Sequence, residues 1–388
     1  YSSAKTFNTG PEPTTGTTPA LRVVSLQGHE ELARLYRYEM TVVHTDANID
    51  ATKLIGNPAR IEFGTPTSVE RHVFGRITEF EFLKWESSKG FYRAVLEPRI
   101  SDLRNTRRSR FFKDRIVSQL IGDVLSGYNS SSDYNTSGIS TTTTKTVMGA
   151  PIQVPVDLHP SRPYVAQYEE SDFDFLMRWL EHDGIFYHFQ QGTDSSGCDK
   201  VVFGESTAAY QAGATTPWPF HTASGAASEI WEANTAQEIQ TAALKVTRLP
   251  ATVKLRDYDP VAAVQIEATA TVTGGLAGVV TLYDNNFTTQ DTGNALATIR
   301  AKELSCRGQL LSGQSNVRAL RAGYKFQMNN HPRSDFNATD YVVISLDITA
   351  TQDPAEAGSI GSTFVNKYVA IKADQQFVPQ RVTAWPRI

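Results

Sequence analysis

Cysteine is scarce in this 388-residue sequence, which contains only Cys198 and Cys306. Two cysteines are too few for a disulfide framework or a thiolate metal centre, so stability has to come from core burial or assembly, and a reducing compartment fits best. A charge excess of one sign is also missing, because 37 basic and 41 acidic residues give a net charge of −4. This balance argues against nucleic acid as a partner and against a basic helix lying on an anionic membrane.

Long hydrophobic runs are absent as well. No segment approaches the roughly 18 consecutive apolar residues of a membrane span, and the opening YSSAKTFNTG lacks the charged and apolar regions of a signal peptide. The opening also lacks an initiator methionine, so we expect the chain to begin inside a longer gene product. With 40% hydrophobic and 20% charged residues, a chain of this length is typical of two or three globular domains.

Most segments alternate apolar and polar residues with a period of two, the pattern of half-buried antiparallel strands. Gly, Pro, Asn and Asp separate these segments. The predicted strands are 21–26, 38–44, 59–64, 73–82, 91–98, 200–204, 251–258, 341–348 and 366–373. The chain is therefore predicted to be mainly β, with closed or sandwiched sheets that hide their edges.

One hairpin pattern occurs twice. Residues 73–100 read as strand, polar turn and strand, and residues 341–379 follow the same plan. From the residues alone, duplication and chance explain this echo equally well.

Helical spacing appears in three places. A helix is predicted near 114–127, with Asp114 as a possible N-cap and Gly127 as a possible C′ residue. Two further helices are predicted at 171–183 and 294–308. Stretches rich in Ser, Thr, Gly, Ala and Pro are predicted as loops, at 8–20, 126–150 and 205–228.

The stretch YEESDFDFLMRWLEHDGIFYHF at 168–189 concentrates carboxylates with two histidines and seven aromatic residues. Ser171 and Asp174 have the S-x-x-D spacing of a capping box, which starts a helix. Gly184 can take the left-handed conformation that ends one. Between them lies the apolar stripe of an amphipathic helix, formed by Phe173, Leu176, Met177 and Leu180.

A catalytic interpretation of this stretch needs carboxylates that converge on a pocket. Glu181 and Asp183 lie two residues apart on the predicted helix and point in different directions, while His182 and His188 fall on different elements. We therefore interpret the acids as structural and the histidines as solvated or hydrogen-bonded.

Other chemical motifs are incomplete. His29 and Glu30 begin like a zinc helix, but Ala33 stands where the second ligand belongs. Asp257 and Asp259 could bind a cation, although a strand followed by a turn accounts for both. No G-x-S-x-G, P-loop, dinucleotide-type G-x-G-x-x-G or Cys-x-x-Cys occurs. We predict no catalytic, cofactor-binding or metal-binding residues, and no cofactor.

The dense stretch resembles the most recognisable motif of the VgrG family, the spike proteins of type VI secretion systems. The matching residues are Tyr168, Glu170, Ser171, Asp172, Phe175, Arg178, Glu181, Gly184, Ile185, Tyr187 and Phe189. A second similar segment lies at 322–346, with Met328 where leucine is usual, and is carried by Gly323, Phe326, His331, Pro332, Asn337 and Tyr341. Segments 73–125 and 252–260 also fit, so the resemblance covers nearly the whole chain.

The resemblance implies two tube-type antiparallel β-barrel domains with inserted α/β elements, lacking the OB-fold neck and β-helical needle found in the family. It implies a first barrel within 1–110, an inserted α/β region at 111–250, and a second barrel with the start of a linker at 251–388. The repeated hairpin fits such a paired-barrel plan and favours duplication. The exposed acids of 168–189 would face solvent or a neighbouring subunit.

The resemblance also implies a structural, non-enzymatic hub. Such a hub is a homotrimeric ring with pseudo-sixfold symmetry that joins a hexameric Hcp-type tube to the spike and transmits the force of contraction. Baseplate proteins, and effectors carried through a further C-terminal region, are the other implied partners. The hub would assemble in the bacterial cytoplasm and then be expelled to the extracellular space or into a target cell, with no membrane insertion by this fragment.

Three alternatives stay open. The hub of a contractile phage tail or of an extracellular injection system is a close sibling. A β-rich glycosidase would use two carboxylates, such as Asp172 and Glu181, in a deep cleft. A carbohydrate-binding module would expose aromatic side chains, with Trp218 and Trp231 as candidates.

Overall fold

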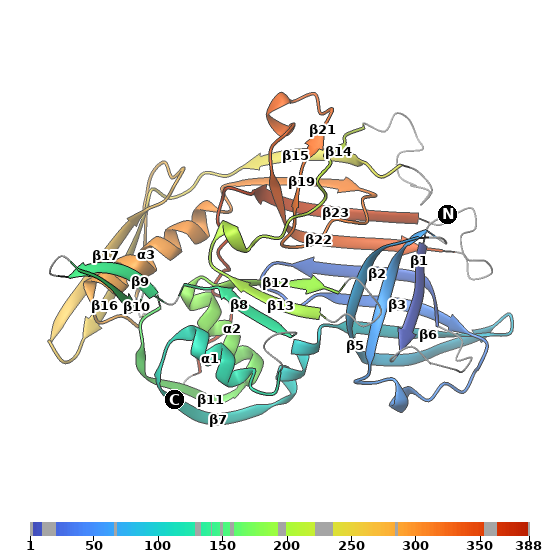
Figure 1. The fold of residues 1–388 in the computed structure, drawn as a ribbon, viewed down its shortest axis with the longest axis horizontal. Helices are drawn as coiled ribbons and strands as arrows, with labels where there is room; N and C mark the ends of the chain where they lie inside the picture. The colour runs from blue at the N-terminus through green and yellow to red at the C-terminus, as the bar shows by residue number, and fades with distance from the viewer. Residues whose placement is uncertain are drawn as a thin grey trace.

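The computed structural model describes residues 3–9, 21–65, 68–128, 133–140, 142–147, 150–155, 159–192, 199–221, 236–283, 286–352 and 363–386. The predicted β class is confirmed, because eleven strands form one curled antiparallel sheet (Figure 1). Its strand order is β1 (Ser3–Thr9), β4 (Pro58–Thr65), β5 (Ser68–Glu86), β6 (Lys89–Glu97), β3 (Arg37–His44), β2 (Arg22–Glu31), β22 (Tyr341–Thr351), β23 (Thr363–Lys372), β19 (Gln309–Ser315) and β15 (Ile239–Val246), with β20 (Lys325–Phe326) on β22.

The sheet consists of two halves that meet where β2 pairs with β22. His29 stands opposite Asp347 in this pair, so strands from the two ends of the sequence are neighbours. On each side of the junction, buried and exposed positions alternate along the strands, as in β3 and β23. This alternation buries one face of each half and explains why the period of two was a reliable strand signal.

The same strand order occurs in both halves. In the first half β5, β6, β3 and β2 follow one another, and in the second half β22, β23, β19 and β15 do so. A further short strand lies on each hairpin, β4 on β5 and β20 on β22. The hairpin echo seen in the sequence therefore corresponds to two hairpins, β5–β6 and β22–β23, in equivalent places.

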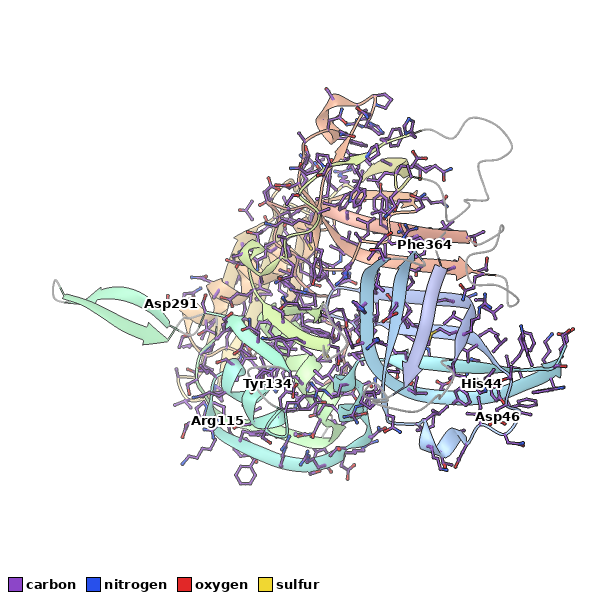
Figure 2. The ribbon with its side chains drawn as sticks, turned by 45° about the vertical axis from the view of Figure 1, so that its right-hand side comes forward. His44, Asp46, Arg115, Tyr134, Asp291 and Phe364 are labelled. Atoms are coloured by element: carbon purple, nitrogen blue, oxygen red, sulfur yellow. The ribbon has the colours of Figure 1, made fainter. Side chains whose placement is uncertain are left out.

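An α/β region is inserted after the first half. Figure 1 places its two helices between a two-stranded ribbon and a three-stranded sheet. The ribbon is β7 (Arg107–Arg115) with β11 (Arg162–Ser171), and the sheet is β12 (Phe186–Gln191), β13 (Asp199–Gly204) and β8 (Tyr134–Gly138). The helices are α1 (Val117–Val124) and α2 (Asp172–Asp183), preceded by the 3-10 helix η2 (Arg99–Asn105). The remaining hairpin, β9 (Thr142–Val147) with β10 (Ala150–Pro155), projects from the body in Figure 2.

A smaller sheet forms a separate unit with its own apolar core. It contains β17 (Val264–Thr271), β16 (Thr252–Asp259) and β18 (Val279–Tyr283), and α3 (Gln290–Ser305) packs on it. The other short elements are η1 (Ala51–Lys53), η3 (Thr207–Ala209), β14 (Trp218–Pro219), β21 (Met328–Asn329) and η4 (Ser334–Phe336).

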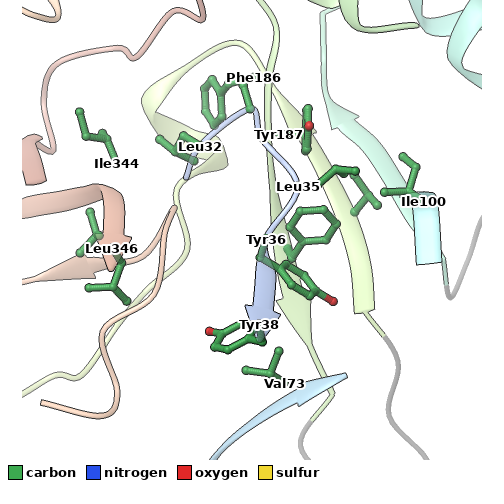
Figure 3. Packing of buried hydrophobic residues seen from close by; sticks show 14 of the residues in the cluster. Leu32, Leu35, Tyr36, Tyr38, Val73, Ile100, Phe186, Tyr187, Ile344 and Leu346 are labelled. Carbon is green, nitrogen blue, oxygen red and sulfur yellow. The ribbon is translucent and has the colours of Figure 1, made fainter. Parts of the chain in front are cut away.

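The main core is continuous from both halves of the large sheet into the inserted region. Leu32 and Tyr36 flank the turn between β2 and β3, and in Figure 3 they lie beside Tyr187 of β12 and Ile344 of β22. Two backbone hydrogen bonds fix this meeting point: the Leu32 amide donates to Ile344 O at 2.9 Å, and the Ala33 amide to Tyr187 O at 2.8 Å. The β2–β3 turn thereby ties β12 of the insert to β22 of the second half.

Two helices were predicted with the wrong bounds. Asp114 is not an N-cap but a residue of β7 with φ of 51°, and α1 is shorter than 114–127 because the ribbon with β11 continues to Arg115. Helix α3 starts earlier than predicted, because the Thr289 hydroxyl accepts the Thr292 amide and caps it.

The predicted loop at 126–150 was also wrong in part, since it contains β8, β9 and the start of β10. Its threonines suit strands as well as loops, and cross-strand pairing decided between them. The segment 205–228 contains η3 and β14, and residues 222–228 lie outside the described part. Residues 8 and 9 end β1, while 10–20 lie outside the described part. Among the described helices, none has the length and apolar content to cross a membrane.

Candidate functional site around helix α2

The two ends of α2 follow the sequence prediction. Ser171 Oγ accepts the Asp174 amide at 3.0 Å and donates to the Asp174 carboxylate at 2.7 Å. Gly184 has φ of 73°, and its amide donates to Leu180 O. The cap, the stop and the buried stripe between them confirm the helix predicted for 171–183.

Four of the six acids in 168–189 are buried, namely Glu170, Asp172, Glu181 and Asp183, so the expectation that the acids face solvent or a neighbouring subunit was wrong for these four. Glu169 and Asp174 are exposed, as expected. Asp172 is 1% exposed and receives Arg108 Nε at 2.9 Å, Arg110 Nη2 at 3.2 Å and Gln167 Nε2 at 2.9 Å. Burial alone would raise the pKa of Asp172, but Arg108, Gln167 and Arg110 outweigh it and keep the pKa below its usual range. The helix N-terminus thus anchors the β7–β11 ribbon.

Glu170 and Arg178 form a second buried pair. Arg178 Nε lies 2.9 Å from one Glu170 oxygen and Arg178 Nη2 lies 2.7 Å from the other, a two-point contact. The same guanidinium donates to Ala166 O at 2.6 Å. Arg178 is 2% exposed, so its charge and that of Glu170 are tolerated in the interior only because each lies beside its partner.

Asp183 is the centre of a third cluster. It contacts His159 Nδ1 at 3.2 Å, Arg162 Nη2 at 2.6 Å and His182 Nδ1 at 2.7 Å. Burial would raise the pKa of Asp183, but the Arg162 guanidinium and the two histidines hold it well below its usual range. Burial would lower the pKa of His159, but hydrogen bonds to Asp183 and Glu205 raise it to about 9.

Glu181 binds the C-terminal segment 377–386. Its Oε2 accepts the amides of Val382 at 2.9 Å and Thr383 at 2.8 Å, and its Oε1 accepts the Thr383 hydroxyl at 2.9 Å. Trp385 completes the attachment, because its ring lies 5.0 Å from that of Trp179 and 4.6 Å from the Arg178 guanidinium.

The C-terminal end of α2 is closed by α3. Arg300 Nη2 donates to Glu181 O at 2.8 Å and to His182 O at 3.0 Å, which satisfies carbonyls that a helix end leaves free. Burial lowers the pKa of Arg300 to about 10. Helix α2 therefore joins the ribbon, the small sheet unit and segment 377–386.

Neither glycosidase candidate lines the cleft beside the start of α2, which is bordered by Glu169, Glu170 and Asp174. Asp172 and Glu181, the glycosidase candidates, are buried and each is committed to separate partners. His182 is buried against Asp183, and His188 is buried with Nε2 donating to Ala209 O at 3.0 Å, so the hydrogen-bonded interpretation of both histidines is confirmed.

The other candidates take structural positions. His29 lies on β2 rather than on a helix, and Asp257 and Asp259 accept nearby backbone amides. Trp218 is packed against the main core instead of forming an exposed platform, and Trp231 lies outside the described residues. Within the described ranges, no group of three or more His, Cys, Asp and Glu side chains could hold a metal ion.

Sequence reasoning missed the basic partners of these acids. The run from 104 to 115 contains Arg108 and Arg110, which meet Asp172, but 62 or more positions separate them from it. The arginine-rich segment 104–115 and the acid-rich segment 168–189 were the available signal for a buried charge framework.

Comparison with known proteins gives consistent matches. The sequence matches the family described as phage tail baseplate hub (GPD) over residues 29–354. The type VI secretion system spike protein VgrG1a of Pseudomonas aeruginosa PAO1 is 24% identical over 371 residues, covering 91% of this chain and 52% of VgrG1a. The actin cross-linking toxin VgrG1 of Vibrio cholerae O1 is 24% identical over 366 residues, covering 89% of this chain and 30% of the toxin. The chain spans about half the length of the spike proteins that it matches.

Solved structures show the same fold. The E. coli c3393 protein, described as a type VI secretion component similar to T4 tail proteins gp27 and gp5, matches with a TM-score of 0.66 at 15% identity, covering 97% of this chain and 80% of that one. The 43 kDa tail protein of prophage MuSo2 from Shewanella oneidensis matches with a TM-score of 0.58 at 9% identity, covering 96% and 99%. Because the family match extends over most of the sequence, this chain belongs to the phage tail baseplate hub (GPD) family.

Proposed function

We propose that this chain is the hub region of a type VI secretion spike, forming a homotrimeric ring with pseudo-sixfold symmetry on a hexameric Hcp-type tube. The observation that carries the proposal is the repeated strand order in the large sheet. Two similar units per chain become six units in a trimer, which matches the symmetry of a hexameric tube. The similarity to spike proteins over nearly the whole chain supports the choice of system.

The action of such a hub is mechanical. A ring stacked on the tube passes the push of contraction to the spike. The buried contacts of Glu181, Arg178 and Trp179 with segment 377–386 provide the attachment that this role requires. No bond of a substrate is broken in this scheme, and the chain acts as a structural protein rather than an enzyme.

The proposal keeps the domain division expected from the sequence: a first tube domain within 1–110, an inserted region at 111–250, and a second tube domain with a linker at 251–388. Baseplate proteins, and effectors carried by further residues of the gene product, are the remaining proposed partners. Assembly in the bacterial cytoplasm would precede expulsion to the outside or into a target cell.

Light scattering on the full-length gene product across a concentration series tests the ring. We expect a trimer that co-sediments with the Hcp-type tube protein of the same system. A product that stays monomeric at every concentration would contradict the proposal.

The hub of a contractile phage tail is the second candidate. It is favoured by the match to the MuSo2 prophage tail protein, which is covered over 99% of its length. Binding to a phage tail-tube protein, with none to an Hcp-type protein, would select it.

A further inference from the structure

The two halves of the large sheet agree in detail as well as in strand order. The Gly56 amide donates to Ile77 O at 2.8 Å, and the Gly323 amide donates to Val343 O at 2.8 Å. The Ile77 amide in turn donates to Asn57 O at 3.2 Å, and the Val343 amide donates to Tyr324 O at 3.1 Å. Both glycines adopt the left-handed backbone conformation, with φ of 78° at Gly56 and 86° at Gly323. This fixes Ile77 of β5 and Val343 of β22 as equivalent positions.

A β-bulge follows at the same place in both strands. The register of β5 with β6 shifts between Ile77 and Glu79, and that of β22 with β23 shifts between Val343 and Ser345. Such bulges bend and twist a strand where its surroundings change. Glu79 is therefore the equivalent of Ser345.

Beyond the bulge, the two strands differ in what lies beside them. In β22, residues 345–351 pair with β2 of the other half. In β5, pairing with β4 ends at Arg76, and no described strand lies beside residues 79–86 on that edge. Figures 1 and 2 both show this end of the β5–β6 hairpin projecting from the first half. Phe82, Leu83 and Trp85 on it are 46–51% exposed.

The equivalent of β2 in the second half is β15, which also has a free edge. β15 pairs with β19 on one side and ends the sheet, and no described strand pairs along its other edge. The first half thus has a free strand edge at the end of β5, and the second half has one along β15. The internal β2–β22 pair shows how two such edges can join.

We propose that β5 of one copy pairs antiparallel with β15 of the next copy, repeating the internal β2–β22 junction between subunits. This inference rests on the proposed trimeric hub and names its subunit contact. Such a contact is head-to-tail, and in the proposed trimer it closes into a ring in which every unit is joined to the next in the same way.

The internal register also predicts which residues meet. Glu31 lies opposite Ser345 in the β2–β22 pair. Carrying that register through the matching strand pairs places Glu79 opposite Thr247, and therefore Glu81 opposite Lys245.

The next pair in this register is Phe82 with Leu244. Phe82 is 51% exposed, and Val246, which would meet Phe80, is 66% exposed. The Lys245 ammonium has no partner among the described residues, whereas Glu81 lies 3.9 Å from Arg93 at the edge of a charged row. The contact thus sets an acid opposite a free cation and covers exposed apolar side chains.

Disulfide trapping tests this register on the full-length gene product. Directly opposite residues of an antiparallel pair have Cβ atoms about 4.5–5.5 Å apart, close enough for a disulfide after small adjustment. We expect Glu81→Cys combined with Lys245→Cys to give oxidised bands of two and three chains on a non-reducing gel. Each single variant should stay a single chain. The matched control is Glu86→Cys with Lys245→Cys, which is out of register.

Charge reversal gives a second readout. Glu81→Lys alone should raise the concentration needed for assembly about two- to fivefold, and Lys245→Glu added to it should restore assembly. If light scattering finds a trimer but the in-register pair cross-links no better than the control, the strand contact is refuted and the hub proposal stands. If no trimer forms at any concentration, both fail together.

Discussion

The Glu181 carboxylate accepts the Thr383 amide at 2.8 Å, although 202 positions separate the two residues in the sequence. The same carboxylate accepts the Val382 amide and the Thr383 hydroxyl. A single acid on a rigid helix therefore fixes the path of segment 377–386.

Glu181→Ala should loosen this segment. Three donors lose their acceptor, so we expect a loss of about 1–3 kcal/mol in unfolding free energy and faster hydrogen exchange at the amides of Val382 and Thr383. Asp335→Ala is the control, because Asp335 is 59% exposed and should change stability by less than about 0.5 kcal/mol. Unchanged exchange at both amides would contradict the proposed attachment.

The Glu170–Arg178 pair should show strong coupling. Arg178→Met leaves the Glu170 charge buried without its partner, and we expect a loss of about 3–5 kcal/mol. Glu170→Gln together with Arg178→Met should cost clearly less than the sum of the two single changes. Denaturant unfolding of the four proteins gives the coupling free energy, and simple additivity would disprove the dependence of each charge on the other.

Alanine substitutions at Gly184 and Gly56 distinguish backbone strain from overpacking. Both have positive φ, but a Cβ at Gly184 would lie 2.5 Å from Ile299 Cγ2, whereas none of the described atoms lies within 4 Å at Gly56. Gly56→Ala should cost about 1 kcal/mol from backbone strain alone. Gly184→Ala should cost at least about 1 kcal/mol more because of overpacking, and Ile299→Ala should recover part of that difference. Equal melting temperatures for the two glycine variants would exclude a role for Ile299.

The stability of the fold should fall between neutral and alkaline pH because of His159. Its pKa is raised from 6.5 to about 9 in the folded chain, so its charged form stabilises the fold fully below about pH 6.5 and this contribution disappears as pH rises through 9. The shift corresponds to about 2–4 kcal/mol. The difference in denaturation midpoint between the unchanged protein and His159→Gln should therefore shrink from pH 6.5 to 9.5. His29→Gln is the comparison, because the pKa of His29 is also raised to about 9 but its side chain is 45% exposed. Solvent screening of its ion pairs should make the pH-dependent difference smaller for His29→Gln than for His159→Gln. A constant difference would show that His159 is not charged in the fold.

Local features of the fold could be predicted and distant ones could not. Helix α2 was found because its cap, stripe and stop all lie within 14 residues from Ser171 to Gly184. The burial of Asp172 and Glu181 was missed because their partners, Arg108 and Thr383, are 64 and 202 positions away. No local pattern records such a pairing. The family resemblance supplied the fold, yet it did not indicate that the matching acids are buried.

Two strands were assigned wrongly because pairing with another strand, and not a local pattern, defines them. Asp114 looked like a cap, but pairing of β7 with β11 extends the ribbon past it. The Thr-rich segment that becomes β9 has no apolar alternation, so only its hairpin partner β10 shows it to be a strand.

The β2–β22 junction also has a consequence for synthesis. β2 ends at Glu31, and its partner on the far side, β22, is complete only at Thr351. At roughly 5–20 residues per second, a ribosome needs roughly 15–60 s to make the intervening chain. During that interval the nascent first half carries an unpaired strand edge, which leaves it open to chaperone binding and to misassembly when the gene is overexpressed.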